Sequence, residues 1–306
     1  GSTHGKSYSG SASLMYVRER ASREKTFVAT RILSSRVIAM TNPGFTHRLL
    51  NGLRGGGVKW LASAIGHRLI PPRVGMQSSV IAAVANKNGL EIGGPSRVFE
   101  AHRLLPVYPA AACVDNVNFS VQTSWEQNLH EGGEFRFDPQ RSPGRQWIRD
   151  ATALTGIADQ AYDFILSSHC LEHVANPLRA LREWHRVTRS DGHLVLLLPD
   201  PSHTFDHRRP LTTLAHLRKD SADNVGEDDV THVAEVLALH DLLRDPWAGS
   251  LENFRERVHH NAANRCIHHH VFNLPLMSAM LEETGWRVLA TEKARPVHLV
   301  AFAQKA

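Results

Sequence analysis

The segment GLEIGGPS, residues 89–96, decides which fold this sequence predicts. Leu90-Glu91-Ile92 has the pattern of a strand end, and Gly93-Gly94 follows it directly. Glycine allows a backbone to turn sharply and to approach a ligand closely, and ligands of open α/β sheets bind at the carboxyl ends of the strands. The segment therefore predicts a ligand-binding turn after a first strand.

Strands and helices alternate from Leu90 onward, which predicts a parallel sheet. The expected strands are short apolar runs bounded by turn residues, and they cover 90–92, 110–114, 146–148, 162–167, 193–198, 286–290 and 297–303. Apolar residues recur at helical spacing over 177–187 and 276–284. We therefore expect an α/β fold, a doubly wound and mostly parallel seven-stranded sheet whose last two strands form a hairpin.

Polar residues follow three of these strands. Asp115 comes directly after the second strand, where a carboxylate can accept two hydrogen bonds from ribose hydroxyls. Asp150 follows the third strand and can accept from an adenine amino group, while the backbone amide of Ala151 donates to the ring. Ser168 and His169 end the fourth strand, beside the expected position of a reactive sulfonium. These residues, in this order, predict a crevice for an adenosyl cofactor.

The run DFILSSHCLEHVANP, residues 163–177, resembles the strand-four segment ending in Leu-Glu-His of the Rossmann-like S-adenosylmethionine-dependent methyltransferases. The resemblance extends from Leu90 to about Pro199, and it continues loosely into the final strands. It implies an enzyme that binds S-adenosylmethionine and releases S-adenosylhomocysteine, but it does not identify the methyl acceptor. Pro95 stands where the family usually has glycine, and Asn176 stands where it often has Asp.

The resemblance also implies which residues surround the cofactor. We expect the cofactor-binding residues to be Glu91, Gly93, Gly94, Pro95, Ser96, Asp115, Asn116, Asp150, Ala151, Ser168 and His169. The Gly-x-Gly-x-x-Gly fingerprint of nicotinamide enzymes is absent from the sequence, and so is a lysine-bearing phosphate loop.

A polar insertion, about residues 200–275, interrupts the alternation after the fifth strand. Asp206, Arg208 and Arg209 can bind an acidic or hydroxyl-rich acceptor, because guanidinium groups pair with carboxylate and phosphate. We add His269 to these expected substrate-binding residues. The alternative is an ordered, ion-paired loop without a ligand.

Histidines supply the candidates for a general base, since imidazole titrates near neutral pH and a hydroxyl acceptor must lose its proton. The candidates are His169, His173, His203 and His207. The chain has 20 histidines, and imidazoles with carboxylates can gather a divalent metal. Their spacing matches no strong metal pattern, so a divalent metal is possible but not favoured, and we assign no metal ligand.

The basic character of the chain is concentrated in its first quarter. Residues 1–75 hold 12 Lys/Arg against 2 Asp/Glu, while the whole chain has a net charge of +5. We expect 1–39 to be a basic leader, a tag or a disordered segment, and 40–75 to be an amphipathic helical cap before a methyltransferase domain over 76–306. Residues 45–70 also have the pattern of a peripheral membrane contact. Nucleic acid is not favoured as a partner, because the catalytic domain itself is not basic.

The sequence favours a cytoplasmic enzyme, since its three cysteines fit no disulfide or zinc spacing and no apolar stretch reaches about 18 residues. We expect a direct in-line transfer of a methyl group to an oxygen or nitrogen of a polar small molecule or glycan. Two alternatives remain open at this point. One is a different transfer on the same fold, such as aminopropyl transfer, and the other is a non-catalytic subunit that binds the cofactor.

Overall fold

The computed structural model describes residues 73–123 and 125–306. The expected leader over 1–39 and nearly all of the expected helical cap over 40–75 lie outside the described residues, so both stay predictions. The strands are β1 (Asn88–Ile92), β2 (Cys113–Asn118), β3 (Glu134–Phe135), β4 (Gly144–Ile148), β5 (Tyr162–Ser168), β6 (Thr188–Pro199), β7 (Trp286–Ala294) and β8 (His298–Lys305). The helices are α3 (Gln77–Val84), α4 (Pro177–Val187), α5 (Leu214–Ala222), α6 (Val233–Leu239), α7 (Leu251–His259), α8 (Asn261–Asn264) and α9 (Leu274–Glu283).

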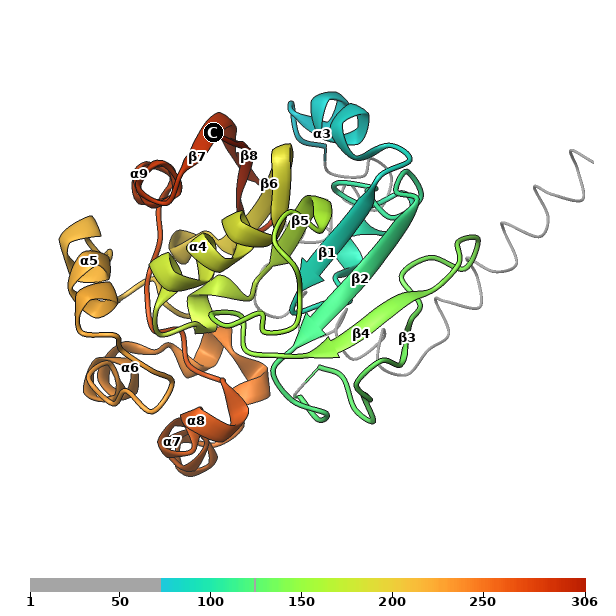
Figure 1. The fold of residues 1–306 in the computed structure, drawn as a ribbon. Coiled ribbons are helices and arrows are strands. Elements are labelled where there is room, and N and C mark those ends of the chain that lie inside the picture. Colours follow the sequence, from blue (N-terminus) through green and yellow to red (C-terminus); the bar gives the residue numbers. More distant parts are fainter. Residues whose placement is uncertain (1–72, 124) are drawn as a thin grey trace, which may run out of the picture. The chain divides into compact units, whose positions relative to one another are not determined.

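One sheet carries all of these strands, in the order β3-β4-β2-β1-β5-β6-β8-β7 (Figure 1). β4, β2, β1, β5 and β6 pair in parallel, whereas β8 runs antiparallel to β6 and to β7. The predicted α/β class, the mostly parallel sheet and the final hairpin are confirmed. The predicted number of strands is wrong by one, because the two residues of β3 add an antiparallel edge strand to β4.

The second strand differs from its prediction. The sequence places it at 110–114 with Asp115 after its end, but β2 continues to Asn118. Asp115 is paired with Leu90 in the middle of the strand, and its carboxylate accepts hydrogen bonds from Tyr162 Oη at 2.6 Å and from the Arg145 amide at 2.8 Å. These partners satisfy a polar side chain inside the sheet, so its polarity does not end the strand.

Both faces of the sheet are covered by apolar cores, as a doubly wound sheet requires. Leu194, Leu196 and Leu198 of β6 face a core that contains residues of α4 and α9, while Val195 and Leu197 face a second core with residues of α3. A continuous apolar run is typical of a strand that is buried on both faces.

Helix α4 lies where the apolar spacing predicts it, and its first turn is fixed by the sequence. Asn176 accepts a hydrogen bond from the Arg179 amide as the N-cap, and Pro177 follows at the first helical position. An amide side chain at the cap and a proline after it are both favoured there. Trp184 and Leu181 on the inner face are fully buried.

The insertion forms α5 to α8 between β6 and α9. Figure 1 shows α5 next to α4. The insertion has a small apolar core of its own, which includes Val236, Phe254, Val258 and Ile267. Within residues 73–123 and 125–306, no helix combines the length and the hydropathy that crossing a membrane requires.

Candidate functional site

A pocket lies at the carboxyl ends of the central strands. β2 lies on one side of β1 and β5 lies on the other, so β1 is next to the point where the strand order reverses and where open α/β sheets bind ligands. The lining residues come from the ends of these strands and from the insertion, and they are Ile92, Gly93, Val117, Asn118, Phe119, Trp125, Arg149, Ala151, Cys170, His173, Val174 and Arg265.

The glycine turn after β1 forms one wall of this pocket. Gly93 has a φ of 85°, and a Cβ added there would lie 2.9 Å from Cys170 Sγ. Asn116 holds Gly94 from both sides, since it accepts from the Gly94 amide at 3.0 Å and donates to the Gly94 carbonyl at 3.1 Å. A Cβ on Gly94 would lie 2.4 Å from the Glu91 carboxyl group. The turn therefore requires both glycines, and Gly93 contributes its backbone to the pocket lining.

Glu91 lies beneath this turn and is fully buried. Its Oε2 accepts a hydrogen bond from Tyr108 Oη at 2.5 Å, and the same hydroxyl accepts from the Ser96 amide at 2.8 Å. Burial raises the pKa of Glu91 to about 7. Glu91 and Ser96 thus belong to the support of the loop, while the neighbouring Pro95 is exposed.

Asn118 at the end of β2 was not identified by the sequence analysis. It lines the pocket, and its Nδ2 donates to the Gly94 carbonyl at 3.0 Å. Its buried Oδ1 has no hydrogen-bond partner among the described residues, so a ligand hydroxyl could pair with it. Asp115 does not line the pocket. The signal that identifies Asn118 is the pairing of Ile92 with Val117. This pairing places the next residues of the two strands, Gly93 and Asn118, side by side.

The loop after β4 contributes Ala151, which lines the pocket as expected. Asp150 precedes it, and its carboxylate already has two partners. It accepts from Thr152 Oγ1 at 2.7 Å and forms an ion pair with Arg265 Nη2 at 2.9 Å. Although burial opposes ionisation, these partners hold the pKa of Asp150 below its ordinary value. Arg265, which also pairs with Glu227 at 2.9 Å, was missed because the insertion and β4 are far apart in sequence.

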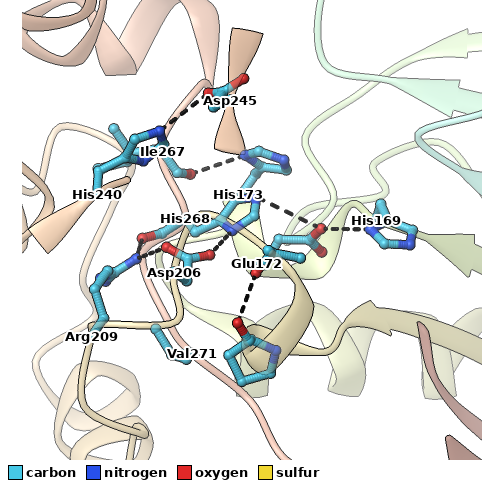
Figure 2. Close-up of polar contacts among 12 residues, drawn as sticks. His169, Glu172, His173, Asp206, Arg209, His240, Asp245, Ile267, His268 and Val271 are labelled. Atoms are coloured by element: carbon cyan, nitrogen blue, oxygen red, sulfur yellow. Dashed lines mark hydrogen bonds and ion pairs between the residues drawn. The ribbon is translucent and has the colours of Figure 1, made fainter. Parts of the chain in front are cut away.

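A histidine cluster surrounds Glu172 of the Leu-Glu-His segment (Figure 2). Glu172 is fully buried, and within the described chain neither of its carboxylate oxygens has a hydrogen-bond partner. His169 Nδ1 lies 3.6 Å and His268 Nε2 lies 4.0 Å from Glu172 Oε1. Burial opposes ionisation of Glu172, but the imidazoles around it hold its pKa below the ordinary value. The cluster therefore holds a carboxylate next to His173, which lines the pocket.

Each imidazole of this cluster is oriented by a different partner. His173 Nδ1 lies 3.0 Å from the Ile267 carbonyl, and burial lowers the pKa of His173 to about 4. His268 Nδ1 is hydrogen-bonded to Asp206; burial lowers the pKa of His268, but the paired carboxylate raises it above the ordinary value. His169 Nε2 lies 2.7 Å from His298 Nδ1. His298, on β8, was not identified from the sequence.

The expected substrate-binding residues have protein partners in the structure. Asp206 and Arg209 are buried and paired at 3.0 Å, and Arg209 also binds Glu235 and the carbonyls of His268 and His269. Arg208 pairs with Asp241 at 3.2 Å. His269 is fully buried, and its amide donates to the Glu172 carbonyl at 2.8 Å. These residues order the wall beside the pocket, and they do not line the pocket itself.

Three further expected residues lie outside the pocket lining. His203 is largely exposed and lies 2.9 Å from Ser202 Oγ. His207 Nε2 lies 2.8 Å from Asp241 Oδ2. Ser168 is buried at the end of β5. Of the four candidate bases, His173 is the one that contributes to the lining.

Part of the chain is similar to a known protein family. Residues 133–196 match a family model described as a methyltransferase domain, and this segment runs from β3 into β6 and includes the Leu-Glu-His segment. No curated protein matches the chain. Among solved structures, an S-adenosylmethionine-dependent methyltransferase from Mesorhizobium loti is 14% identical, with 74% of this chain and 95% of that chain covered and a TM-score of 0.42. One from Methanosarcina mazei is 14% identical, with 74% and 96% covered and a TM-score of 0.40.

The described residues also fit the cofactor that such a domain uses. The turn at Gly93 leaves room for a ligand close to the backbone, and the free Oδ1 of Asn118 can accept from a hydroxyl group. Phe119 and Trp125 add aromatic surface to the same lining. The pocket thus offers a close backbone approach, a hydroxyl acceptor and an aromatic wall, which suit an adenosyl group.

Proposed function

We propose that this chain, a Rossmann-like S-adenosylmethionine-dependent methyltransferase, methylates an oxygen or nitrogen of a polar small molecule or glycan. The observation that supports this acceptor class is the histidine cluster of His169, Glu172, His173 and His268 beside the pocket. His173 is the member of this cluster that lines the pocket, and its second ring nitrogen can form a hydrogen bond to a ligand hydroxyl. A flat apolar acceptor would leave the second ring nitrogen of His173 in the pocket lining without a partner, which is unfavourable.

We assign the cofactor to the pocket that begins at the glycine turn. Gly93 and the loop held by Asn116 would receive the methionine end, and Asn118 would accept from a ribose hydroxyl in place of Asp115. Ala151 and the aromatic pair Phe119 and Trp125 would enclose the adenine. Glu91, Gly94 and Ser96 position the loop.

The cofactor supplies a methyl group that is already activated on a sulfonium, so the protein must align the acceptor and remove its proton where necessary. We assign to His173 the role of the base that removes the proton from the acceptor. Its Nδ1 faces the Ile267 carbonyl at 3.0 Å, which favours a proton on Nδ1 and leaves Nε2 as the acceptor. Asp206, held by Arg209, fixes the neighbouring His268 in the same way.

Calorimetry followed by a transfer assay tests this proposal. The purified chain should bind S-adenosylmethionine and S-adenosylhomocysteine, and labelled methyl groups should pass to sugars or polar hydroxy acids more readily than to flat aromatic acceptors. Methylation of apolar aromatic acceptors alone would overturn the acceptor class. Transfer from the aminopropyl donor alone would favour aminopropyl transfer. Cofactor binding without transfer from either donor would favour a non-catalytic subunit.

A further inference from the structure

A second group of titratable side chains lies within the insertion, apart from the pocket lining. His216 and Asp220 are on α5, His232 directly precedes α6, and His270 lies just before α9. One ligand atom from each of the four residues lies within 4.8 Å of all the others. We propose that these four side chains bind one zinc ion, and that the ion fastens the insertion together as a structural site.

The separations between these ligand atoms fit a tetrahedral site. Bonds of about 2.0 Å at tetrahedral angles place two ligand atoms about 3.3 Å apart. His216 Nε2 lies 3.3 Å from His232 Nε2 and 3.3 Å from Asp220 Oδ2, and His270 Nε2 lies 3.0 Å from the same Asp220 oxygen. The spacing that zinc requires is therefore present in the arrangement of the side chains.

The orientation of the rings supports the same conclusion. The ring planes of His216 and His232 are inclined by 79°, those of His216 and His270 by 64°, and those of His232 and His270 by 70°. Steeply inclined rings can bring their Nε2 atoms to one point without stacking on each other. Three imidazole nitrogens and one carboxylate oxygen are a donor set that zinc accepts.

Hydrogen bonds alone satisfy this cluster less well than a cation does. His216 Nε2 is equally close to His232 Nε2 and Asp220 Oδ2, and a single proton on that nitrogen cannot form two well-aligned hydrogen bonds. One divalent cation at the centre accepts a lone pair from each of the four atoms.

The position of the site indicates what the ion does. Four protein ligands complete a tetrahedral shell, which is typical of a structural zinc rather than a catalytic one. Asn176, the cap of α4, donates to the Asp220 carbonyl at 3.3 Å, and His269, next to His270, donates through its amide to the Glu172 carbonyl. The ion would thus tie α5, α6 and residues 268–270 to the wall that contains the histidine cluster.

Metal analysis of the protein tests the site directly. The full chain, purified without a metal-affinity column, should contain about one zinc per chain, and His270→Ala and Asp220→Asn should contain less than about a tenth of that. His259→Ala is the matched control, because His259 is an exposed histidine of the same insertion, and it should keep the full zinc content. Replacement of the zinc by Co²⁺ should give the visible absorption of a tetrahedral site.

Thermal unfolding provides a second readout that does not depend on activity. A strong chelator should lower the melting temperature of the wild-type chain, and added zinc should restore it, whereas neither should change that of His270→Ala. Zinc content far below one per chain, with no change in melting temperature on zinc addition, overturns the site. Cofactor affinity measured on the same samples keeps the two proposals separate, since the pocket lining contains none of the four ligands.

Discussion

At the scale of single residues, the proposed cofactor pocket depends on Asn118, which the sequence analysis did not identify. Asp115 has the chemistry expected of a ribose-binding residue, but its carboxylate is already paired with Tyr162 and the Arg145 amide. Asn118, three residues later, lines the pocket with an unpaired oxygen among the described residues. The position of a side chain relative to the strand end, rather than its charge, decides which of the two can reach a ligand.

This difference predicts that one substitution weakens cofactor binding and that another leaves it nearly unchanged. Asn118→Ala should weaken S-adenosylmethionine binding by about tenfold, because one hydrogen bond to the ligand is lost and the loop at Gly94 loses a donor. Asp115→Asn, which keeps an acceptor for Tyr162, should leave the affinity nearly unchanged. Titration calorimetry measures both, and a larger loss in Asp115→Asn than in Asn118→Ala would return the ribose to Asp115.

Glu91, beneath the glycine turn, should make the free energy of unfolding depend on pH. Its pKa in the folded chain is about 7, against 4.5 for an ordinary glutamate, so the folded state retains this proton more strongly than the unfolded state. The stability that this proton provides is complete below pH 4.5 and is lost as the pH rises through 7. Between pH 4.5 and 8, Glu91→Gln should therefore gain about 3 kcal/mol of unfolding free energy relative to the wild type.

Urea unfolding across this pH range measures the difference. The wild type is measured beside Glu91→Gln at each pH, so that the effects of pH on all other groups cancel. A Glu91→Gln difference that stays constant would mean that Glu91 titrates in its ordinary range.

At the scale of elements, α4 connects the sheet to the insertion. Asn176 caps α4 through its Oδ1, and its Nδ2 donates to the Asp220 carbonyl on α5. The same side chain therefore caps the start of one helix and contacts another. Its amide can do both, whereas a carboxylate can only accept.

Two substitutions separate these contributions. Asn176→Ala should lower the free energy of unfolding by about 1–2 kcal/mol, because the cap and the buried contact are both lost. Asn176→Ser should retain a capping oxygen and lose the donor to α5, so its cost should be smaller. Denaturant unfolding compares the two, and equal losses would show that the cap contributes nothing.

At the scale of the whole domain, Arg265 joins the insertion to the pocket at the carboxyl ends of the strands. It forms ion pairs with Asp150 after β4 and with Glu227 in the insertion, both at 2.9 Å. It also lies over the Phe119 ring, with its guanidinium carbon 5.0 Å from the ring centroid. One side chain thus links three parts of the chain that are distant in sequence.

Removal of this link should destabilise the fold and loosen the insertion. Arg265→Ala should lower the free energy of unfolding by about 2 kcal/mol, since two partly buried carboxylates lose their cation, and hydrogen exchange over 251–267 should become faster. Arg218→Ala, which breaks an exposed ion pair with Glu283, is the control and should change neither quantity. Unchanged exchange in Arg265→Ala would show that other contacts hold the insertion.

The sequence by itself determined the α/β class, the glycine turn at Gly93, the helix over 177–187 and the methyltransferase resemblance. These features depend on residues that are neighbours along the chain, such as the Asn176-Pro177 cap and the continuous apolar run of β6, so local pattern is sufficient for them. The tertiary structure alone decided the end of β2, the pocket position of Asn118 and the contacts of Arg265. It also brought His216, Asp220, His232 and His270 to one point, because the distance between side chains from separate elements depends on how those elements pack and not on their spacing in the sequence.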